Sequence, residues 1–403
     1  MPSLRRCMLI GIMRHIISEP EQILWKSPDP SNIFSGSPGI CRLASGRLAA
    51  THDIRGPGMA GQPGIAVKSN SLGIIWLSDD HGRSWRKSGT FPFFHARPFS
   101  AGKSLYILGH DGDLMIMKSD DDGETWQNPA RLTSGQQWHQ APCNVHYANG
   151  CVYLIMERKV YDDIRGWSVS VLAPVLMRAP VEADLTERIS WTFASETAFR
   201  DIVDTAELDH HGLPFFSSPA KNYSELAPGR YCAPAGWLET NVVQFRDPGH
   251  YWFDPDGKTI HLWMRAHTGM TGYAAIAKVI EQGDTAGTGE MVTTLESAPS
   301  GKTCVYVPCP GGQMKFHVVY DEKTSLYWLL STQATDSMTR AELLGNDRYN
   351  LPDNQRSRLQ LSFSRNMIDW CFAGMAAIGG NERASRHYAS MIIDNEDLIV
   401  LSR

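Results

Sequence analysis

Residue types able to bind and attack a negatively charged ligand occur in four short segments that lie far apart in the chain. Arginine pairs with a carboxylate through two parallel hydrogen bonds and keeps its charge at any relevant pH. A tyrosine hydroxyl that gives its proton to a glutamate avoids the repulsion that an anionic nucleophile would meet beside a carboxylate. Arg265, with Arg356 or Arg358, therefore suits a carboxylate-bearing sugar, and Glu239 and Tyr388 suit the proton relay. This chemistry requires Glu239 to lie within hydrogen-bond reach of Tyr388.

Each of these residues, taken singly, also has an ordinary structural explanation. A glutamate that opens a strand is more often solvated, and a tyrosine in a β-rich run more often packs in a core. An arginine at a strand end often lies along apolar surface with its charge in water. Four arginines compete for one or two roles, so at least two of them are expected to be surface charges: Arg356, Arg358, Arg365 and Arg386. The case for chemistry therefore depends on the whole set and its order in the chain.

β-Hairpins are the elements that must position these side chains. Six times the chain repeats an apolar run, a turn rich in Gly, Asn or Asp, and a second apolar run, which is the pattern of a hairpin. Helical periodicity is weak, so the pattern predicts an all-β fold, a β-propeller of six blades. The six hairpins are SPGICRLASGRLAATHD (37–53), FSAGKSLYILGHD (99–111), CNVHYANGCVYLIMER (143–158), TNVVQF with DPDGKTIHLWMR (240–265), KFHVVYDEKTSLYWLLS (315–331) and HYASMIIDNEDLIVLS (387–402).

An eight-residue turn occurs twice, as SDDHGRSW and SDDDGETW, with starting points 41 residues apart. A supersecondary unit that recurs at about this period is typical of propeller blades. Gly82 and Gly123 can adopt the positive φ of a tight turn, and Asp80 and Asp121 can accept hydrogen bonds from nearby backbone amides. We therefore assign both aspartates to folding rather than to catalysis.

Charge, cysteine spacing and hydropathy exclude several classes of protein. The formal charge of -5 and the absence of a Lys/Arg stripe argue against a nucleic-acid partner. The eight cysteines show no metal-ligand spacing, so no zinc site is expected, and whether they form disulfides stays open. No run approaches the roughly 20 apolar residues of a membrane span. Arg14 and His15 interrupt the N-terminal apolar run, which makes a signal peptide unconvincing and slightly favours a cytoplasmic location.

We divide the chain into an N-terminal extension, residues 1–35, and a propeller, residues 36–403. The last hairpin is followed directly by Arg403, so the sixth blade lacks an outer pair of strands. Either the segment ILWKSP of the extension closes the ring or the last blade is truncated. We favour truncation, because an unclosed propeller exposes a strand edge. Residues 160–236 contain two expected outer strands, VSVLAPVLMRAP and ERISWTFAS, and then a long polar loop with DHHGLPFFSSPAKNYS, which is expected to be functional or disordered.

The quoted segments resemble those of the Asp-box sialidases (neuraminidases), a family of six-bladed propellers. The repeated turn resembles the Asp box, SPGICRLASGRLAATHDIR resembles the first-blade segment, and WLETNVVQF resembles the stretch that carries the catalytic Glu. HLWMR ends where the second substrate Arg of the family falls. RSRLQLSFSRNMIDW resembles the segment of the third Arg, and RHYASMIIDNEDLIVL that of the nucleophilic Tyr. The resemblance covers most of the chain from about residue 36 onward.

This resemblance implies a glycoside hydrolase of exo-sialidase type that acts on a glycan with an acidic terminal sugar and needs no cofactor. It implies that Tyr388 is the nucleophile, that Glu239 is its base, and that Arg265 binds the carboxylate of the substrate. Arg356, Arg358 and Arg386 are the candidates for the remaining substrate-binding arm.

The first blade departs from the family pattern in two ways. Gly36 or Ser37 stands where the family has its first Arg, and no acidic residue lies between Asp53 and Asp79, where the family has its general acid. Asp53 or His52 could supply the proton instead, with Arg55 nearby to tune the pKa and to bind substrate. Both departures affect the part of the site that reads the carboxylate, so the substrate need not be sialic acid.

Three hypotheses about function therefore stay open. The first is the sialidase-type hydrolase, and the second is a carbohydrate-active lyase that acts on uronates, with Arg for the carboxylate and Tyr or His as base. The histidines that make a lyase arguable are His139, His146, His210, His211 and His387. The third is a non-catalytic glycan-binding propeller, favoured by the missing first-blade groups and by an aromatic content of 10% available for stacking on sugars.

Overall fold

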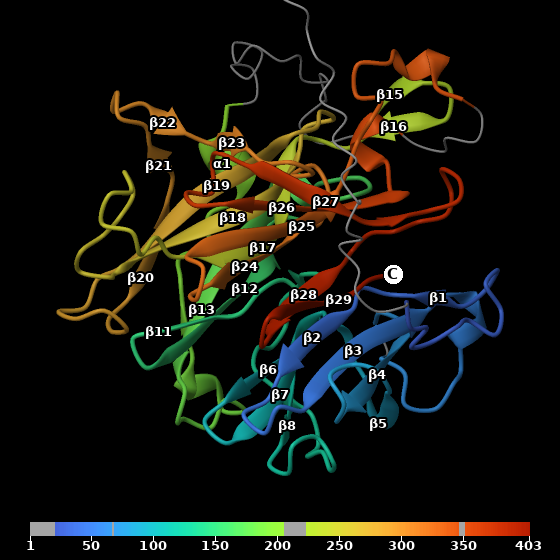
Figure 1. Ribbon diagram of the computed structural model, residues 1–403, viewed down its shortest axis with the longest axis vertical. Coiled ribbons are helices and arrows are strands. Elements are labelled where there is room, and N and C mark those ends of the chain that lie inside the picture. Colours follow the sequence, from blue (N-terminus) through green and yellow to red (C-terminus); the bar gives the residue numbers. More distant parts are fainter. Residues whose placement is uncertain (1–20, 67, 205–222, 346–350) are drawn as a thin grey trace, which may run out of the picture.

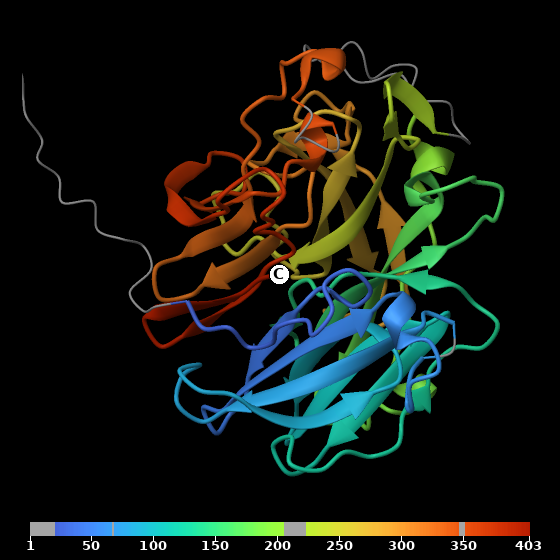
Figure 2. The ribbon, with the colours of Figure 1, turned by 90° about the vertical axis from the view of Figure 1, so that its right-hand side faces the viewer.

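The computed structural model describes residues 21–66, 68–204, 223–345 and 351–403, which form an all-β fold. Five antiparallel sheets of four or five strands stand around a common centre as the blades of a β-propeller (Figures 1 and 2). A two-stranded sheet, β28 (Ser390–Asp394) with β29 (Asp397–Leu401), follows the fifth blade. All-β architecture is therefore confirmed.

The strands of each blade follow one another along the chain. Blade 1 contains β1 (Phe34–Ser35), β2 (Gly39–Arg42), β3 (Leu48–Arg55), β4 (Ser71–Ser78) and β5 (Arg86–Phe91). Blade 2 contains β6 (Phe94–Ala101), β7 (Ser104–Asp111), β8 (Asp113–Ser119) and β9 (Ala130–Arg131). Blade 3 contains β10 (Trp138–His139), β11 (His146–Ala148), β12 (Cys151–Lys159), β13 (Leu172–Pro180) and β14 (Thr192–Phe193). Blade 4 contains β17 (Gly236–Val243), β18 (Thr259–His267), β19 (Tyr273–Glu281), β20 (Met291–Thr294) and β23 (Tyr306–Pro308). Blade 5 contains β24 (His317–Asp321), β25 (Leu326–Thr332), β26 (Arg358–Ser364) and β27 (Cys371–Ile378).

The remaining elements are short. Two small sheets pair β15 (Ser224–Ala227) with β16 (Arg230–Cys232) and β21 (Glu296–Ser297) with β22 (Thr303–Cys304). The helix α1 (Phe199–Ile202) has a single turn. Within the region 160–236, β13 and β14 lie in the two expected outer strands, and most of the expected polar loop, with His210 and His211, lies outside the described residues.

The prediction of six blades is wrong, because the described residues form five. All six predicted hairpins are present, but the sixth, β28–β29, receives no further strand among the described residues. β28 contacts β2 of blade 1 and β24 of blade 5, so it fills the position between them without completing a blade. The segment 21–33 contains no strand and therefore does not pair with β29. Counting hairpins overestimated the blades, since a blade needs more strands than one hairpin supplies.

The cores lie between neighbouring blades, where apolar side chains of adjacent sheets interdigitate. Between blades 3 and 4, Tyr153, Trp237 and Leu262 belong to one fully buried cluster. Between blades 4 and 5, Trp263 and Phe316 belong to another. Burying such large side chains is the main stabilising term of the fold. No disulfide joins any of the seven cysteines in the part of the chain that the structure describes.

Both copies of the repeated turn form the predicted hydrogen bonds. Asp121 accepts from the backbone amide of Thr125 at 2.8 Å and from its hydroxyl at 2.6 Å. Asp80 makes the same two bonds with Ser84 at the same two distances. The indole of Trp126 packs between blades 1 and 2.

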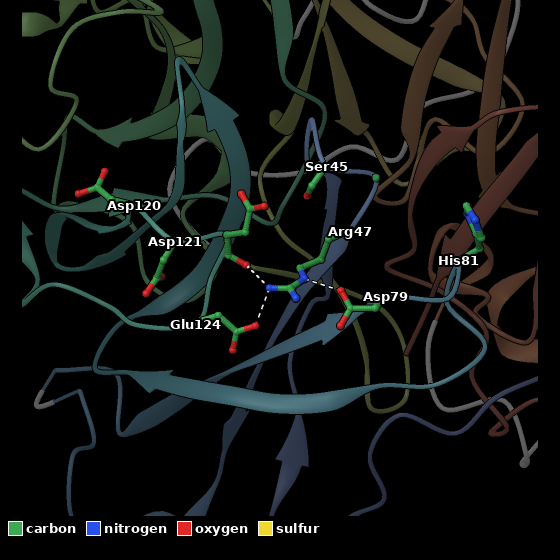
Figure 3. Close-up of a pocket in the computed structure, with 9 residues that line it drawn as sticks. Ser45, Arg47, Asp79, His81, Asp120, Asp121 and Glu124 are labelled. Carbon is green, nitrogen blue, oxygen red and sulfur yellow. Dashed lines mark hydrogen bonds and ion pairs between the residues drawn. The ribbon is translucent and has the colours of Figure 1, made fainter.

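Figure 3 shows the exposed pocket at which the two turns meet. Arg47 bridges it by donating hydrogen bonds to Asp79 at 2.6 Å and to Glu124 at 2.7 Å. Each of the two acidic partners belongs to a different copy of the turn, so the bridge ties blade 1 to blade 2.

We expect Asp121→Ala and Asp80→Ala to destabilise the protein without impairing the activity of the folded fraction. Hydrogen bonds from Thr125 lower the pKa of Asp121 to about 2, so the folded state favours the ionised carboxylate. This contribution is present above the unfolded pKa of ~3.9 and is lost as pH falls through about 2. Urea unfolding followed by tryptophan fluorescence should show a lower midpoint for each variant. A stable but inactive Asp121→Ala protein would contradict the assignment of this residue to folding.

Candidate active site

Arg265, at the end of β18, joins the two side chains on which the predicted chemistry depends. Its Nη1 donates hydrogen bonds to Glu239 Oε2 at 3.2 Å and to the Tyr388 hydroxyl at 3.1 Å. Its Nε donates to the Gln313 carbonyl at 2.7 Å. Glu239 and Arg265 are each 2% exposed, so this ion pair is buried. The described contacts include no direct hydrogen bond between Glu239 and Tyr388, and the guanidinium is what brings their oxygens together.

Three residues around the centre of the propeller adopt a backbone conformation that is rare for side chains with a Cβ. Glu239 has φ 55°, Tyr388 has φ 53° and His95 has φ 52°. Glu239 lies where β17 shifts register against β18, and His95 where β6 shifts against β7. Such bulges redirect a side chain, and backbone strain of this kind concentrates at functional sites. The strain therefore singles out Glu239, Tyr388 and His95 as residues whose placement matters.

Neighbouring groups explain how Glu239 is held. Thr240, the next residue, donates its amide and its hydroxyl to Glu157 Oε1, each at 3.1 Å. Asn241 follows and exchanges hydrogen bonds with the Phe316 carbonyl and the Val318 amide of blade 5. The side chains of Glu239, Thr240 and Asn241 thus each bind a different neighbour, and these contacts fix the β-bulge in β17.

The buried Lys315 holds the two residues that follow Tyr388 in the chain. The Lys315 ammonium donates to the Ala389 carbonyl and, at 3.0 Å, to the Ser390 hydroxyl. The Ser390 hydroxyl donates in turn to the Pro38 and Pro142 carbonyls. Burial, followed by the charge of Glu239, raises the pKa of the Tyr388 hydroxyl, so the hydroxyl is protonated at neutral pH.

A pair of arginines lies on the other side of Tyr388. Arg356 Nη1 and Arg403 Nη2 both contact His387 Nε2, at 3.1 and 2.9 Å. The Arg403 guanidinium lies 5.0 Å from the centroid of the Tyr388 ring, and that of Arg356 lies 5.9 Å from it. Burial and the two guanidiniums hold the pKa of His387 well below its usual value, so the imidazole is neutral and accepts these bonds.

Arg55, Arg356 and Arg403 are half-buried and form no ion pair with a carboxylate of the described residues. Burial, and then the like charges of Arg356 and Arg55, lower the pKa of Arg403. With His52 and His387, these three arginines line one end of a cavity of about 1500 Å³. Cationic groups gathered without a counter-ion suit an anionic ligand.

Asp53 and His52 are less accessible than the expected acid would be. Asp53 is fully buried, its Oδ1 accepts the His95 amide at 2.9 Å, and burial raises its pKa to about 7. His52 is 5% exposed, contacts the Ser35 hydroxyl at 3.4 Å, and has its pKa lowered to about 4 by burial. A neutral, buried imidazole is a weak proton donor at pH 7.

The place of the missing first-blade arginine is filled by close packing. A Cβ added to Gly36 would lie 2.1 Å from Asp53 Oδ2 and 2.9 Å from its Cγ. No side chain fits there unless Asp53 moves, so an arginine at position 36 could not bind a substrate in this packing.

We expect Gly36→Ala to lower the free energy of unfolding by roughly 1–3 kcal/mol, the range for overpacking a core. Gly380→Ala is the matched control, because a Cβ at Gly380 meets no atom within 4 Å. Urea denaturation of both variants measures the difference. Equal stability of the two would show that Asp53 can move to admit a side chain at Gly36.

Two predicted arginines lie apart from this cluster. Arg358 Nε donates to Gln333 at 2.8 Å, and Arg386 donates to the neighbouring Ser385 carbonyl at 2.8 Å. Neither has a described contact with Tyr388. Arg55 lies 5.1 Å over the ring of Phe94 and lines the cavity.

Sequence reasoning missed Arg403 and Trp167 at the site. The Arg265 guanidinium lies 4.9 Å over the partly exposed Trp167 ring, which offers an aromatic face beside the reactive groups. Trp167 belongs to a loop and Arg403 follows the last strand, so neither stood in a recognisable motif. Only the fold brings them to Tyr388.

Three histidines from blades 2 and 3 form a second polar cluster. The ring centroids of His95, His110 and His139 lie 5.6 to 6.2 Å apart. His139 Nδ1 contacts Glu157 Oε2 at 3.0 Å. No three His, Cys, Asp or Glu side chains among the described residues are placed to hold a metal ion. The same part of the chain contains no helix that is long and apolar enough to cross a membrane.

Comparison with solved structures gives sialidases of the same architecture. The Hadza microbial sialidase Hz136 matches with a TM-score of 0.51 at 12% identity, over 91% of this chain and 62% of that one. The leech intramolecular trans-sialidase matches with a TM-score of 0.51 at 10% identity, over 96% and 67%. A mutant of the NanB sialidase from Streptococcus pneumoniae matches with a TM-score of 0.51 at 10% identity, over 96% and 68%.

These likenesses show the sialidase-like propeller fold and not the substrate, because the identities are low. This chain spans less than two thirds of the Hadza enzyme. No family model and no curated protein matches the sequence.

Proposed function

We propose that the chain is a glycoside hydrolase of exo-sialidase type, which removes an acidic terminal sugar from a glycan. The observation that carries the proposal is the contact of one Arg265 nitrogen with both the Tyr388 hydroxyl and the Glu239 carboxylate. Positive φ at Glu239 and Tyr388 supports it, since such strain is retained where placement matters. The propeller fold, shared with sialidases, adds the weaker support of analogy.

In the proposed reaction, the Tyr388 oxygen attacks the anomeric carbon of the sugar while its proton passes to Glu239. This transfer requires the two side chains, which each bind Arg265 Nη1 here, to come into direct contact. The bond to the leaving oxygen breaks, and that oxygen takes a proton from a general acid. Water then attacks the same carbon and the bond to Tyr388 breaks. The proton held by Glu239 returns to the Tyr388 oxygen, and the proton lost by the water restores the general acid. Arg265 donates a hydrogen bond to the phenolic oxygen and so stabilises the negative charge that develops on it.

Arg265 is proposed to act mainly by holding Glu239 and Tyr388, because its Nε and Nη1 are already bonded within the protein. The carboxylate of the sugar is assigned to Arg356 and Arg403, with Arg55 beside them. These guanidiniums line the cavity and have no carboxylate partner among the described residues. In this proposal Arg403 supplies the carboxylate-binding guanidinium that is missing at Gly36.

The proposal is tested with three 4-methylumbelliferyl glycosides, those of N-acetylneuraminic acid, glucuronic acid and glucose. We expect release of the fluorophore from an acidic sugar and none from glucose. An unsaturated product from uronate oligosaccharides, detected by its ultraviolet absorbance, would replace the proposal with the lyase. Saturable binding of the acidic sugars without any turnover would replace it with the glycan-binding propeller.

A further inference from the structure

The proposed hydrolysis needs a group that protonates the leaving oxygen, and neither first-blade candidate suits this role. His52 lines the cavity, but burial lowers its pKa to about 4, so its imidazole is neutral at pH 7. Asp53 has no exposed surface and His52 is 5% exposed. A general acid must touch the oxygen that it protonates, directly or through one water. The acid must therefore come from another blade.

His139, on β10 of blade 3, has the features that this role requires. Its side chain is 28% exposed, whereas Glu157, which contacts its Nδ1 at 3.0 Å, is fully buried. Because Nδ1 faces the buried carboxylate, Nε2 lies on the opposite side of the ring, free to exchange a proton with a ligand. A carboxylate that fixes the tautomer and orientation of an imidazole is the arrangement of catalytic histidines.

The same carboxylate connects His139 to the strand that carries the proposed base. Glu157 Oε1 accepts from the amide and the hydroxyl of Thr240, the residue after Glu239. On its other side, the His139 ring lies 5.6 Å from that of His95. The His95 ring stacks on Phe94 at 3.7 Å, and Arg55 lies 5.1 Å over that ring, so packed rings connect His139 to the arginine cluster.

The other histidines of this cluster are poor acids. His95 and His110 are each 8% exposed, and burial lowers their pKa values, that of His110 to about 3. The pKa of His267, near Arg265, is also lowered to about 3 by burial. Asp353 is 4% exposed and faces His267 at 3.6 Å. His139 is the histidine of this set with the most exposed ring.

We infer that His139, oriented by Glu157, is the general acid and base of the proposed glycosidase, an inference that rests on the proposed function. In the first step, the Nε2 proton of the imidazolium moves to the leaving oxygen as the glycosidic bond breaks. In the second step, the neutral imidazole takes a proton from the water that displaces Tyr388. The imidazolium is restored, and no other reactant is needed.

The test compares two leaving groups on the purified chain. His139→Asn keeps an amide that can donate to Glu157 but removes the proton at Nε2. An alkoxide is a poor leaving group without protonation, whereas methylumbelliferone leaves readily without it. We expect kcat/KM of the variant to fall by ~10² or more for the methyl α-glycoside of N-acetylneuraminic acid, within the usual range for general acid catalysis. For formation of the glycosyl-enzyme from the 4-methylumbelliferyl glycoside we expect less than a tenfold change.

The control is His250→Asn, since the half-buried His250 lies in the turn between β17 and β18 and is not among the residues that line the cavity. Circular dichroism checks that both variants fold. An equal loss on both substrates, or no loss on either, with an active wild type, would overturn the role of His139 alone. A wild type inactive on both glycosides would overturn the proposed function and this inference with it.

Discussion

Tyr388→Phe is expected to lower kcat by ~10² or more while the protein keeps its fold. The substitution removes one oxygen and retains the ring that lies against Arg356 and Arg403. Because burial and Glu239 raise the pKa of the hydroxyl, Tyr388 needs a proton acceptor to become a nucleophile. Steady-state kinetics on the acidic 4-methylumbelliferyl glycoside, with thermal unfolding as the check on folding, measures the effect.

Glu239→Gln should affect the same step, so the double variant should be far from additive. If Tyr388 only packs against the arginines, the Phe variant should turn over like the wild type, since the ring is preserved. Full turnover by Tyr388→Phe would exclude the nucleophile and favour the lyase or the binding protein.

The combined variant Arg356→Gln with Arg403→Gln is expected to lower kcat/KM for the acidic glycoside by about 10²- to 10⁴-fold. Two hydrogen bonds from cations to a carboxylate would be lost, and each contributes roughly 1.5–3 kcal/mol. The effect should appear largely in KM, because the carboxylate is bound before and during reaction. Both guanidiniums are half-buried and carry like charges, so removing them should cost little stability beyond their hydrogen bonds to His387, which thermal unfolding can check.

Arg358→Gln is the matched control for this pair. Arg358 is two residues from Arg356 but donates to Gln333 rather than facing Tyr388. A loss on Arg358→Gln equal to that of the double variant would place the carboxylate elsewhere and contradict the assignment.

Local patterns predicted the strands and turns well, because hairpins depend on neighbouring residues. Each predicted hairpin is present, and Asp80 and Asp121 make the turn bonds expected of them. The number of blades could not be predicted from hairpins, since the strands that complete a blade are joined by long-range pairing. β28 and β29 show this, as their hairpin forms without a third strand among the described residues.

Spatial proximity could be predicted only for the candidate residues that stand in motifs. Glu239, Arg265 and Tyr388 belong to segments with recognisable order, and the structure brings them together. Arg403 and Trp167 stand in no motif, and their places depend on how the blades close around the centre. The bulge at Glu239 and the positive φ of Tyr388 depend on tertiary contacts that no local pattern encodes.

Peptide mass spectrometry after incubation with a fluorinated sialosyl fluoride tests the central claim most directly. The fluorine beside the anomeric carbon slows hydrolysis of a glycosyl-enzyme, so the covalent intermediate accumulates. The account predicts a single adduct on the peptide that contains Tyr388, absent from Tyr388→Phe. An adduct on another residue, or turnover of acidic glycosides with no adduct at Tyr388, would contradict it.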